Sequence, residues 1–191
     1  MGARYRGSQL IAKLRALDEE PESDQILEAL PEQTRTMMRG VGRGEWLPVS
    51  VDIDLNTAMW DVLGEVGIRR VCARSILDSL NGPLLGPLAQ GTIRLFGVSP
   101  RHFFKMVPRG WSQVYRNAGS ASFDDCELGR SVRLSYEELP PEFFARGYLE
   151  GIAGGLEGLL RFCELPGESI IRMRDPSGGR LHVDVSWAER A

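Results

Sequence analysis

The stretch RGYLEGIAGGLEGLLRFC, residues 146–163, decides the fold. At about 100° of rotation per residue, a helix would place its five glycines within one arc of about 100°. These glycines are Gly147, Gly151, Gly154, Gly155 and Gly158. Beside this arc lie apolar side chains, and the remaining stripe is charged: Arg146, Glu150, Glu157 and Arg161. The pattern predicts a deeply buried helix with one smooth face.

This glycine face requires compensation from tertiary packing. Each glycine inside a helix is less favourable than alanine by about 0.8–1.0 kcal/mol, so five cost roughly 4–5 kcal/mol. In return, a face without Cβ atoms lets another backbone or a flat molecule approach closely. The favoured interpretation is packing against a sheet or a neighbouring helix. The alternative is that the face lines a cavity or a subunit contact.

The segments around this helix predict strands. Residues 120–127 and 130–137 alternate polar and apolar side chains, which is typical of a strand with one buried face. Residues 169–173 and 180–187 form a second such pair, separated by the turn-forming segment DPSGG. We therefore expect an α+β fold with a C-terminal antiparallel sheet of about four strands, crossed by the long glycine-rich helix.

The N-terminal half has helical periodicity. Helices are expected over 8–17 with Ser8 as N-cap, from residue 23, and from residue 32 to the glycines at 40–44. Further helices are expected from an Asp54 cap to residue 80 with a break at Gly67, over 84–97, and from Pro100 to about residue 117, divided at Pro108. We expect one domain over 1–191, comprising a helical N-terminal cap (1–45), a helical core (46–118), and the sheet with its glycine helix (119–191).

Composition and charge exclude some classes of function. The formal net charge of −3 disfavours a nucleic-acid binder, which normally carries a basic face. No apolar run approaches the roughly 18–20 residues of a membrane span, and charges interrupt the N-terminus where a signal peptide would be apolar, so we expect a cytoplasmic protein. The cysteines are too widely spaced to suggest a zinc site or a disulfide framework: Cys72, Cys126 and Cys163.

Catalytic motifs are not evident, and we expect neither an enzyme nor a metal site. No GxSxG motif occurs, and the glycine-rich segment GVGRG lacks the Lys-Ser/Thr of a phosphate loop. His182, Asp184 and Ser186 alternate along one strand about 7 Å apart, which suits a solvated face better than a catalytic triad.

The C-terminal motifs resemble those of known families. The stretch YEELPPEFFARGYLEGIAGGLEGLLRFCE, followed by HVDVSW, resembles the C-terminal part of 4-vinyl-reductase-like domains, haem-nitric-oxide-binding domains and small TRAPP subunits. Together with LPEQTRTMM, GEWLPVSVDIDLNTAMWDVLGE and GTIRLFGVSPRHFFKMVPRGWSQVYRNAG, it makes the whole chain similar to a paralogous myxobacterial family of unknown function. The resemblance implies a helical half followed by a sheet crossed by the glycine helix, and no known activity.

The haem-binding relatives also imply one candidate cofactor site. They use a histidine on a helix ahead of the sheet and a Tyr-x-Ser-x-Arg motif that holds the haem propionates. His102 is in about the right place for the first. The strand reads Arg133-Leu134-Ser135-Tyr136 and lacks the second.

Three functional hypotheses follow. The first is a non-catalytic small-molecule-binding, sensory or regulatory domain whose cavity lies beside the glycine helix and takes a small apolar ligand of unknown identity. The second is a protein-interaction adaptor that acts as a homodimer, and the third is a haem-based gas sensor with His102 as ligand. The candidate cavity residues are Phe103, Met106, Trp111, Tyr115, Phe144, Tyr148, Gly151 and Gly155.

Overall fold

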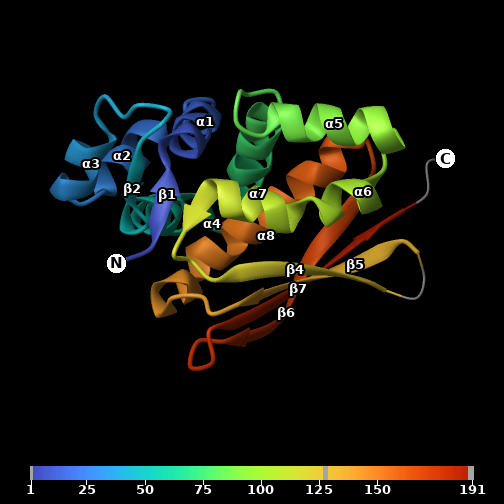
Figure 1. The fold of residues 1–191 in the computed structure, drawn as a ribbon. Helices are drawn as coiled ribbons and strands as arrows, with labels where there is room; N and C mark the ends of the chain where they lie inside the picture. Colours follow the sequence, from blue (N-terminus) through green and yellow to red (C-terminus); the bar gives the residue numbers. More distant parts are fainter. Residues whose placement is uncertain (1, 127–128, 189–191) are drawn as a thin grey trace.

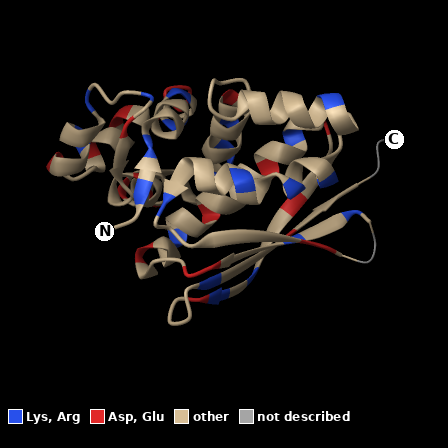
Figure 2. Ribbon diagram, viewed as in Figure 1, with Lys and Arg blue, Asp and Glu red and all other residues tan. Residues whose placement is uncertain are grey.

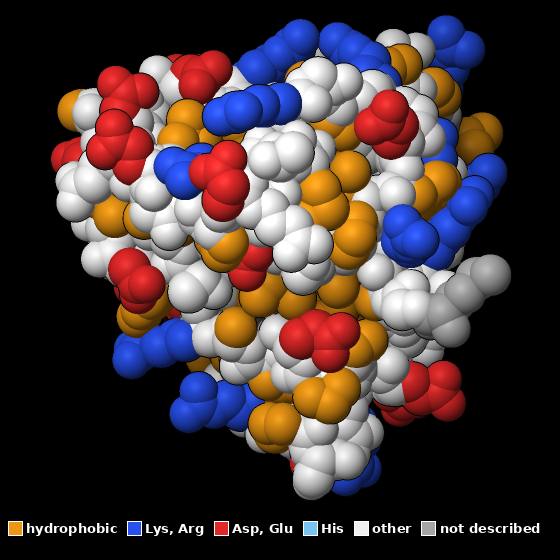
Figure 3. All heavy atoms as spheres, turned by 90° about the vertical axis from the view of Figure 1, so that its left-hand side faces the viewer, with side chains coloured by type: hydrophobic (Ala, Val, Ile, Leu, Met, Phe, Trp, Pro, Cys, Tyr) orange, Lys and Arg blue, Asp and Glu red, His pale blue; other side chains and the backbone are white. Residues whose placement is uncertain are grey.

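The computed structural model describes residues 2–126 and 129–188. A four-stranded sheet lies on one side of the molecule and the helices cover one of its faces, with the N-terminal helices grouped at one end (Figure 1). Acidic and basic residues are interspersed over helices and strands (Figure 2). Both signs of charge also occur on the face shown in Figure 3, where apolar atoms form a band between them.

The N-terminal segment contains the three expected helices and one strand that was not expected. The helices are α1 (Gly7–Leu17), α2 (Ser23–Ala29) and α3 (Glu32–Met38). Before them, β1 (Arg4–Arg6) pairs antiparallel with β2 (Trp46–Pro48) and β3 (Tyr115–Arg116) in a small sheet of order β2-β1-β3. The prediction of Ser8 as N-cap is wrong, because β1 leads directly into α1 and the Gly7 N–H donates to the Glu45 carbonyl at 2.9 Å.

The long helix α4 (Ser50–Leu80) begins earlier than predicted. Asp54 is therefore not its cap but lies one turn inside, where it accepts a hydrogen bond from Thr34. The helix breaks at Gly64, with φ 65°, rather than at Gly67. Only glycine adopts this left-handed backbone conformation without steric cost.

The next three helices form the upper layer in Figure 1. They are α5 (Gly86–Phe96), α6 (Pro100–Lys105) and α7 (Val107–Val114). Pro108 lies in the first turn of α7, so it divides the segment as predicted. The helix α7 stops at Val114 instead of residue 117, since Tyr115 and Arg116 pair with β1.

The C-terminal part is the predicted antiparallel sheet, which makes the fold α+β as expected. Its strands are β4 (Ser120–Asp125), β5 (Ser131–Glu137), β6 (Gly167–Asp175) and β7 (Arg180–Trp187), in the order β4-β5-β7-β6. The alternate apolar residues of the two central strands are buried beneath the helices: Val132, Leu134, Tyr136, Leu181, Val183 and Val185. A short 3-10 helix, η1 (Pro141–Phe144), leads from β5 to α8.

The glycine face of α8 (Arg146–Phe162) packs against α4, a helix, rather than against the sheet. A Cβ atom at Gly147 would lie 2.5 Å from the Asn56 carbonyl oxygen, and one at Gly154 would lie 2.5 Å from the Arg69 Cα. A Cβ atom at Gly158 would lie 2.6 Å from the Ala73 carbonyl oxygen. These distances leave no room for a side chain, so the glycines set how closely the two helices approach.

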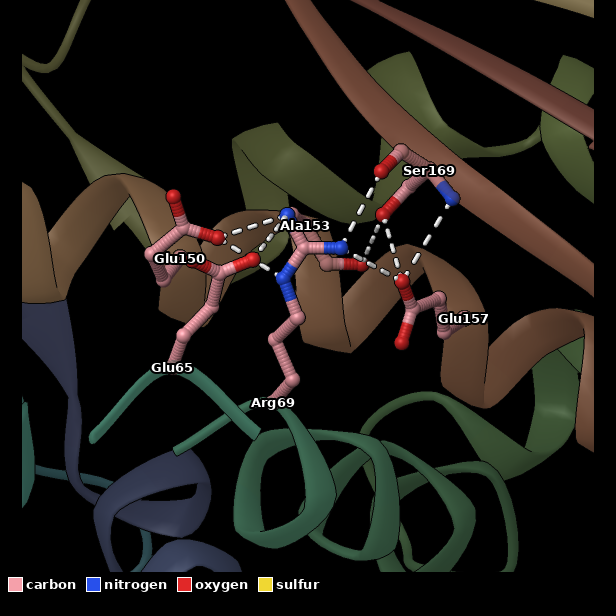
Figure 4. Close-up of polar contacts among 6 residues, drawn as sticks. All are labelled: Glu65, Arg69, Glu150, Ala153, Glu157 and Ser169. Atoms are coloured by element: carbon pink, nitrogen blue, oxygen red, sulfur yellow. Dashed lines mark hydrogen bonds and ion pairs between the residues drawn. The ribbon is translucent and has the colours of Figure 1, made fainter. Parts of the chain in front are cut away.

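A cluster of charged side chains fastens this helix pair to the sheet (Figure 4). The Arg69 guanidinium donates to Glu150 at 2.7 Å and to Glu157 at 2.8 Å, both on α8. It also donates to the Ser169 carbonyl oxygen of β6 at 3.1 Å. Burial lowers the pKa of Arg69, but the two glutamates more than offset this and the pKa is raised. Three elements far apart in the sequence are thus joined by one side chain.

Two neighbouring glycines of α8 provide a direct test of this packing. We expect Gly154→Ala to lower the free energy of unfolding by about 1–3 kcal/mol, because its methyl group would meet the Arg69 backbone. Gly155→Ala should be neutral or stabilising by up to about 1 kcal/mol, since its Cβ would lie 3.4 Å from the flexible Ile76 side chain and alanine favours the helix. Urea unfolding of both variants measures the difference. Equal effects would contradict this account of the glycine face.

Candidate functional site

A cavity of about 170 Å³ lies between the helices of the N-terminal half and the glycine helix. Its walls come from β1, α1, α4 to α7, β3, β5 and α8, together with Leu85 at the start of α5. Most of the lining surface is apolar and is formed by Ile76, Leu85, Leu88, Phe103, Met106, Val107, Trp111, Val114 and Ile152, among others. The cavity is close in size to an engineered apolar cavity of about 150 Å³ that holds benzene.

The structure brings seven of the eight predicted cavity residues to this cavity. They are Phe103, Met106, Trp111, Tyr115, Tyr148, Gly151 and Gly155. Phe144 is not among the lining residues and instead packs against the core from η1. The helical periodicity that predicted the seven residues does not extend to η1, which has a tighter 3-10 geometry.

A buried ion pair, which the sequence did not predict, forms part of the lining. The Lys13 ammonium of α1 pairs with the Asp52 carboxylate of α4, and the two side chains are 9% and 0% exposed. Burial lowers the pKa of Lys13, but the adjacent carboxylate outweighs it and the net shift is upward, so the lysine is charged. One signal was available: Lys13 is spaced three and four residues from the apolar Leu10 and Leu17, which places it on the buried face of its helix.

Asp52 is the centre of a hydrogen-bonded group. Besides Lys13, the Asn56 amide donates to its carboxylate at 3.1 Å and the Tyr115 hydroxyl donates at 3.3 Å. The Cys72 thiol donates to the Asn56 side-chain oxygen at 3.6 Å. Burial raises the pKa of Cys72 to about 11, so this thiol is protonated at neutral pH.

Two more tyrosines, Tyr5 and Tyr148, line the cavity near this group. Burial raises the pKa of each well above its ordinary value, and the negative charge of Asp52 raises it further. Tyr5 packs against the Tyr115 ring at 5.3 Å between centroids. No described atom has hydrogen-bond geometry to the buried Tyr148 hydroxyl, although Tyr115 is near enough to influence its pKa.

His102, the candidate haem ligand, does not line the cavity although its neighbour Phe103 does. Its ring stacks on Phe96 at 4.4 Å between centroids, and its Nδ1 atom is buried without a hydrogen-bond partner. On a helix, adjacent residues point about 100° apart, so Phe103 faces the cavity and His102 faces α5. The imidazole is therefore not directed into the enclosed space.

The lining residues do not fit a haem. Pockets for drug-sized ligands measure about 300–1,000 Å³, well above the 170 Å³ of this cavity. Lys13 is the one cation of the described lining, and Asp52 neutralises it, so no free positive charge is left for two propionates. Tyr136 and Ser135, on the strand where the propionate motif would lie, face a buried Trp111 ring and the neighbouring strand β4.

The remaining titratable residues do not gather into a metal or catalytic cluster. Within the described part of the chain, no group of three or more His, Cys, Asp or Glu side chains is placed to hold a metal ion. Asp184 is engaged by Arg133 at 2.7 Å and by Arg172 at 3.1 Å on the outer face of the sheet. The described helices include none that is long and apolar enough to cross a membrane.

Comparison with known proteins shows the fold. No protein-family model and no curated protein sequence matches the chain. Among solved structures, a Cs H-NOX mutant carrying 4-cyano-L-phenylalanine matches with a TM-score of 0.68 at 13% identity, covering 96% of this chain and 97% of that one. An oxygen-binding H-NOX domain related to soluble guanylate cyclases matches with a TM-score of 0.65 at 13% identity, covering 96% and 95%. An H-NOX domain of T. Tengcongensis gives 0.63 at 12% identity, covering 96% and 98%.

These matches support the haem-nitric-oxide-binding part of the resemblance as a likeness of fold. Identities of 12–13% carry no residue roles from those proteins to this chain. The narrower resemblance to a myxobacterial paralogous family has no support from any of the comparisons.

The buried ion pair predicts a large asymmetry between single and double replacements. Asp52→Ala leaves the Lys13 charge buried without a partner and should lower the free energy of unfolding by about 3–5 kcal/mol. The double variant Lys13→Met/Asp52→Leu removes both charges and should recover most of this loss. Denaturant unfolding at neutral pH measures both effects.

The exposed pair of Arg35 and Glu32 is the control for this comparison. Glu32→Ala should change the free energy of unfolding by at most about 1 kcal/mol, because water screens the charges. An Asp52→Ala effect as small as that of Glu32→Ala would mean that the Lys13 charge reaches water in solution.

Proposed function

We propose that this chain is a non-catalytic regulatory domain that binds a small, mostly apolar molecule in the cavity and does so without haem. The observation that carries the proposal is the cavity itself, about 170 Å³ with predominantly apolar walls. Apolar surface of this kind gains free energy when it excludes water in favour of an apolar ligand. The size suits one aromatic ring or a short branched hydrocarbon.

The position of the cavity supports a regulatory role. A ligand inside it would touch α1 and α4 from the N-terminal half, α5 to α7 from the upper layer, and α8 from the C-terminal part. Occupation would therefore stabilise one relative packing of these elements over others. A ligand that prefers one arrangement shifts the population toward it, which is the physical basis of a sensor.

The likeness to H-NOX structures raises haem sensing as the competing proposal, and the residues present favour the haem-free one. His102 stacks on Phe96 outside the lining, and the only lysine or arginine of the described lining is paired with Asp52. A haem site would require α6 to rotate and the cavity to widen.

An absorption spectrum distinguishes the two. We expect the protein purified with haem supplied during expression to show no Soret band, and added haemin to give no saturable band. The matched control is His102→Ala, which should have the same spectrum as the natural chain. A stoichiometric Soret band that disappears in His102→Ala would overturn the haem-free proposal.

Thermal unfolding with a small aromatic hydrocarbon tests the cavity directly. Ethylbenzene should raise the melting temperature saturably, since a ligand at a hundred times its Kd adds about 2.7 kcal/mol to the stability of the native state. Gly155→Leu should place its side chain in the cavity and abolish this effect. Gly91→Leu, a helical glycine of α5 outside the lining with open space around its Cβ, should preserve it.

A second candidate function is contact with another copy of this chain. The end of α5 and the following loop expose large apolar side chains, namely Leu95, Phe96 and Val98. Light scattering tests it with the natural chain and Leu95→Glu. A dimer that Leu95→Glu converts to a monomer would support this function, and a monomeric natural chain would exclude it.

A further inference from the structure

The Tyr148 hydroxyl is a buried polar atom that the protein leaves without a partner. The side chain comes from the first turn of α8, is 2% exposed, and lines the cavity. Its ring is held in place by an edge-to-face contact with Phe143 at 4.7 Å between centroids. Buried hydroxyls in proteins are nearly always hydrogen-bonded, so an exception in a cavity wall points to a partner that enters the cavity.

The neighbouring polar groups are already committed. Asp52 accepts from Lys13, Asn56 and Tyr115. The Ser75 and Thr92 hydroxyls donate to carbonyl oxygens of their own helices at 2.8 and 2.9 Å. Among the described residues that line the cavity, Tyr148 carries the one buried side-chain polar atom with no hydrogen-bond partner.

The charge balance of the lining limits what the partner can be. Lys13 and Asp52 are the only charged residues of the described lining, and they neutralise each other. An ionic ligand would lose its hydration without gaining a free counter-charge, which is strongly unfavourable in an apolar site. The occupant must therefore be neutral.

The protonation state of Tyr148 determines the complementary group. Burial raises the pKa of this hydroxyl well above its ordinary value, so it keeps its proton at physiological pH. A phenolic hydroxyl can donate one hydrogen bond, and a ligand oxygen with lone pairs is a suitable acceptor. The apolar walls would hold the rest of the molecule.

We infer that the cavity selects neutral single-ring molecules with one carbonyl acceptor, such as aryl ketones, aldehydes or esters, and that Tyr148 donates the selecting hydrogen bond. This inference rests on the proposed function, because it requires that the cavity binds a small molecule. It adds the chemical class of the ligand and the residue that determines it.

Matched probe molecules test the selection. Acetophenone and α-methylstyrene have nearly the same shape and differ in a carbonyl oxygen against a CH₂ group, while benzoate is similar in size and carries a charge. Calorimetric titration of the natural chain should give acetophenone about tenfold tighter binding than α-methylstyrene, as expected for one hydrogen bond. Benzoate should bind at least about tenfold more weakly than acetophenone at pH 7.

Variants identify the donor. Tyr148→Phe should bring the affinities of acetophenone and α-methylstyrene together by weakening only the former, and should melt at or above the temperature of the natural chain, because it removes an unpaired hydroxyl. Tyr136→Phe, which alters another tyrosine of the lining, should keep the tenfold preference. Loss of the preference in Tyr136→Phe but not in Tyr148→Phe would overturn the assignment of the donor.

The carbonyl stretch of bound acetophenone gives a readout that needs no variant. Hydrogen bonding should lower its infrared frequency below that of acetophenone in an alkane, and an unshifted frequency would overturn the inference. Equal binding of acetophenone and α-methylstyrene would also overturn it, yet leave the proposed function standing. Failure of both compounds, and of ethylbenzene, to bind would overturn the proposed function as well.

Discussion

The close approach of the α4 and α8 backbones is the constraint on which the rest of the structure depends. At Gly147, Gly154 and Gly158, any side chain would collide with the backbone of Asn56, Arg69 or Ala73. The roughly 4–5 kcal/mol of helix propensity that five glycines sacrifice is offset by this contact and by its consequences. One consequence is that Arg69 of α4 reaches past α8 to β6 and joins both helices to the sheet.

The same helix pair also forms one wall of the cavity. Gly155 has room for a Cβ atom, and with Gly151 and Tyr148 it lines the space beside α4. Lys13 and Asp52 are buried at this wall, where an ion pair adds little net stability compared with apolar residues of similar volume. A polar group in a largely apolar cavity costs stability but gives directionality to binding, which is the usual composition of a ligand site.

The architecture is that of H-NOX domains over 96% of the chain, at 13% identity. A fold positions a site but does not determine its chemistry. In this chain the helix ahead of the sheet carries a histidine, yet its ring stacks against α5, and the lining offers an ion pair and tyrosines where a haem would need space and free cations. The ligand that suits these residues is smaller and neutral.

The sequence by itself determined the helices, the four-stranded antiparallel sheet and the glycine face, because periodicities of 3.6 and 2 residues record which side of each element is buried. It also indicated seven residues of the cavity wall, from apolar positions on predicted helices and from the adjacent Tyr115. Only the tertiary structure decided that the glycines meet α4, that Arg4–Arg6 forms a strand, and that Lys13 pairs with Asp52, 39 residues away. These contacts join distant segments, and local patterning says that a face is buried without saying against what.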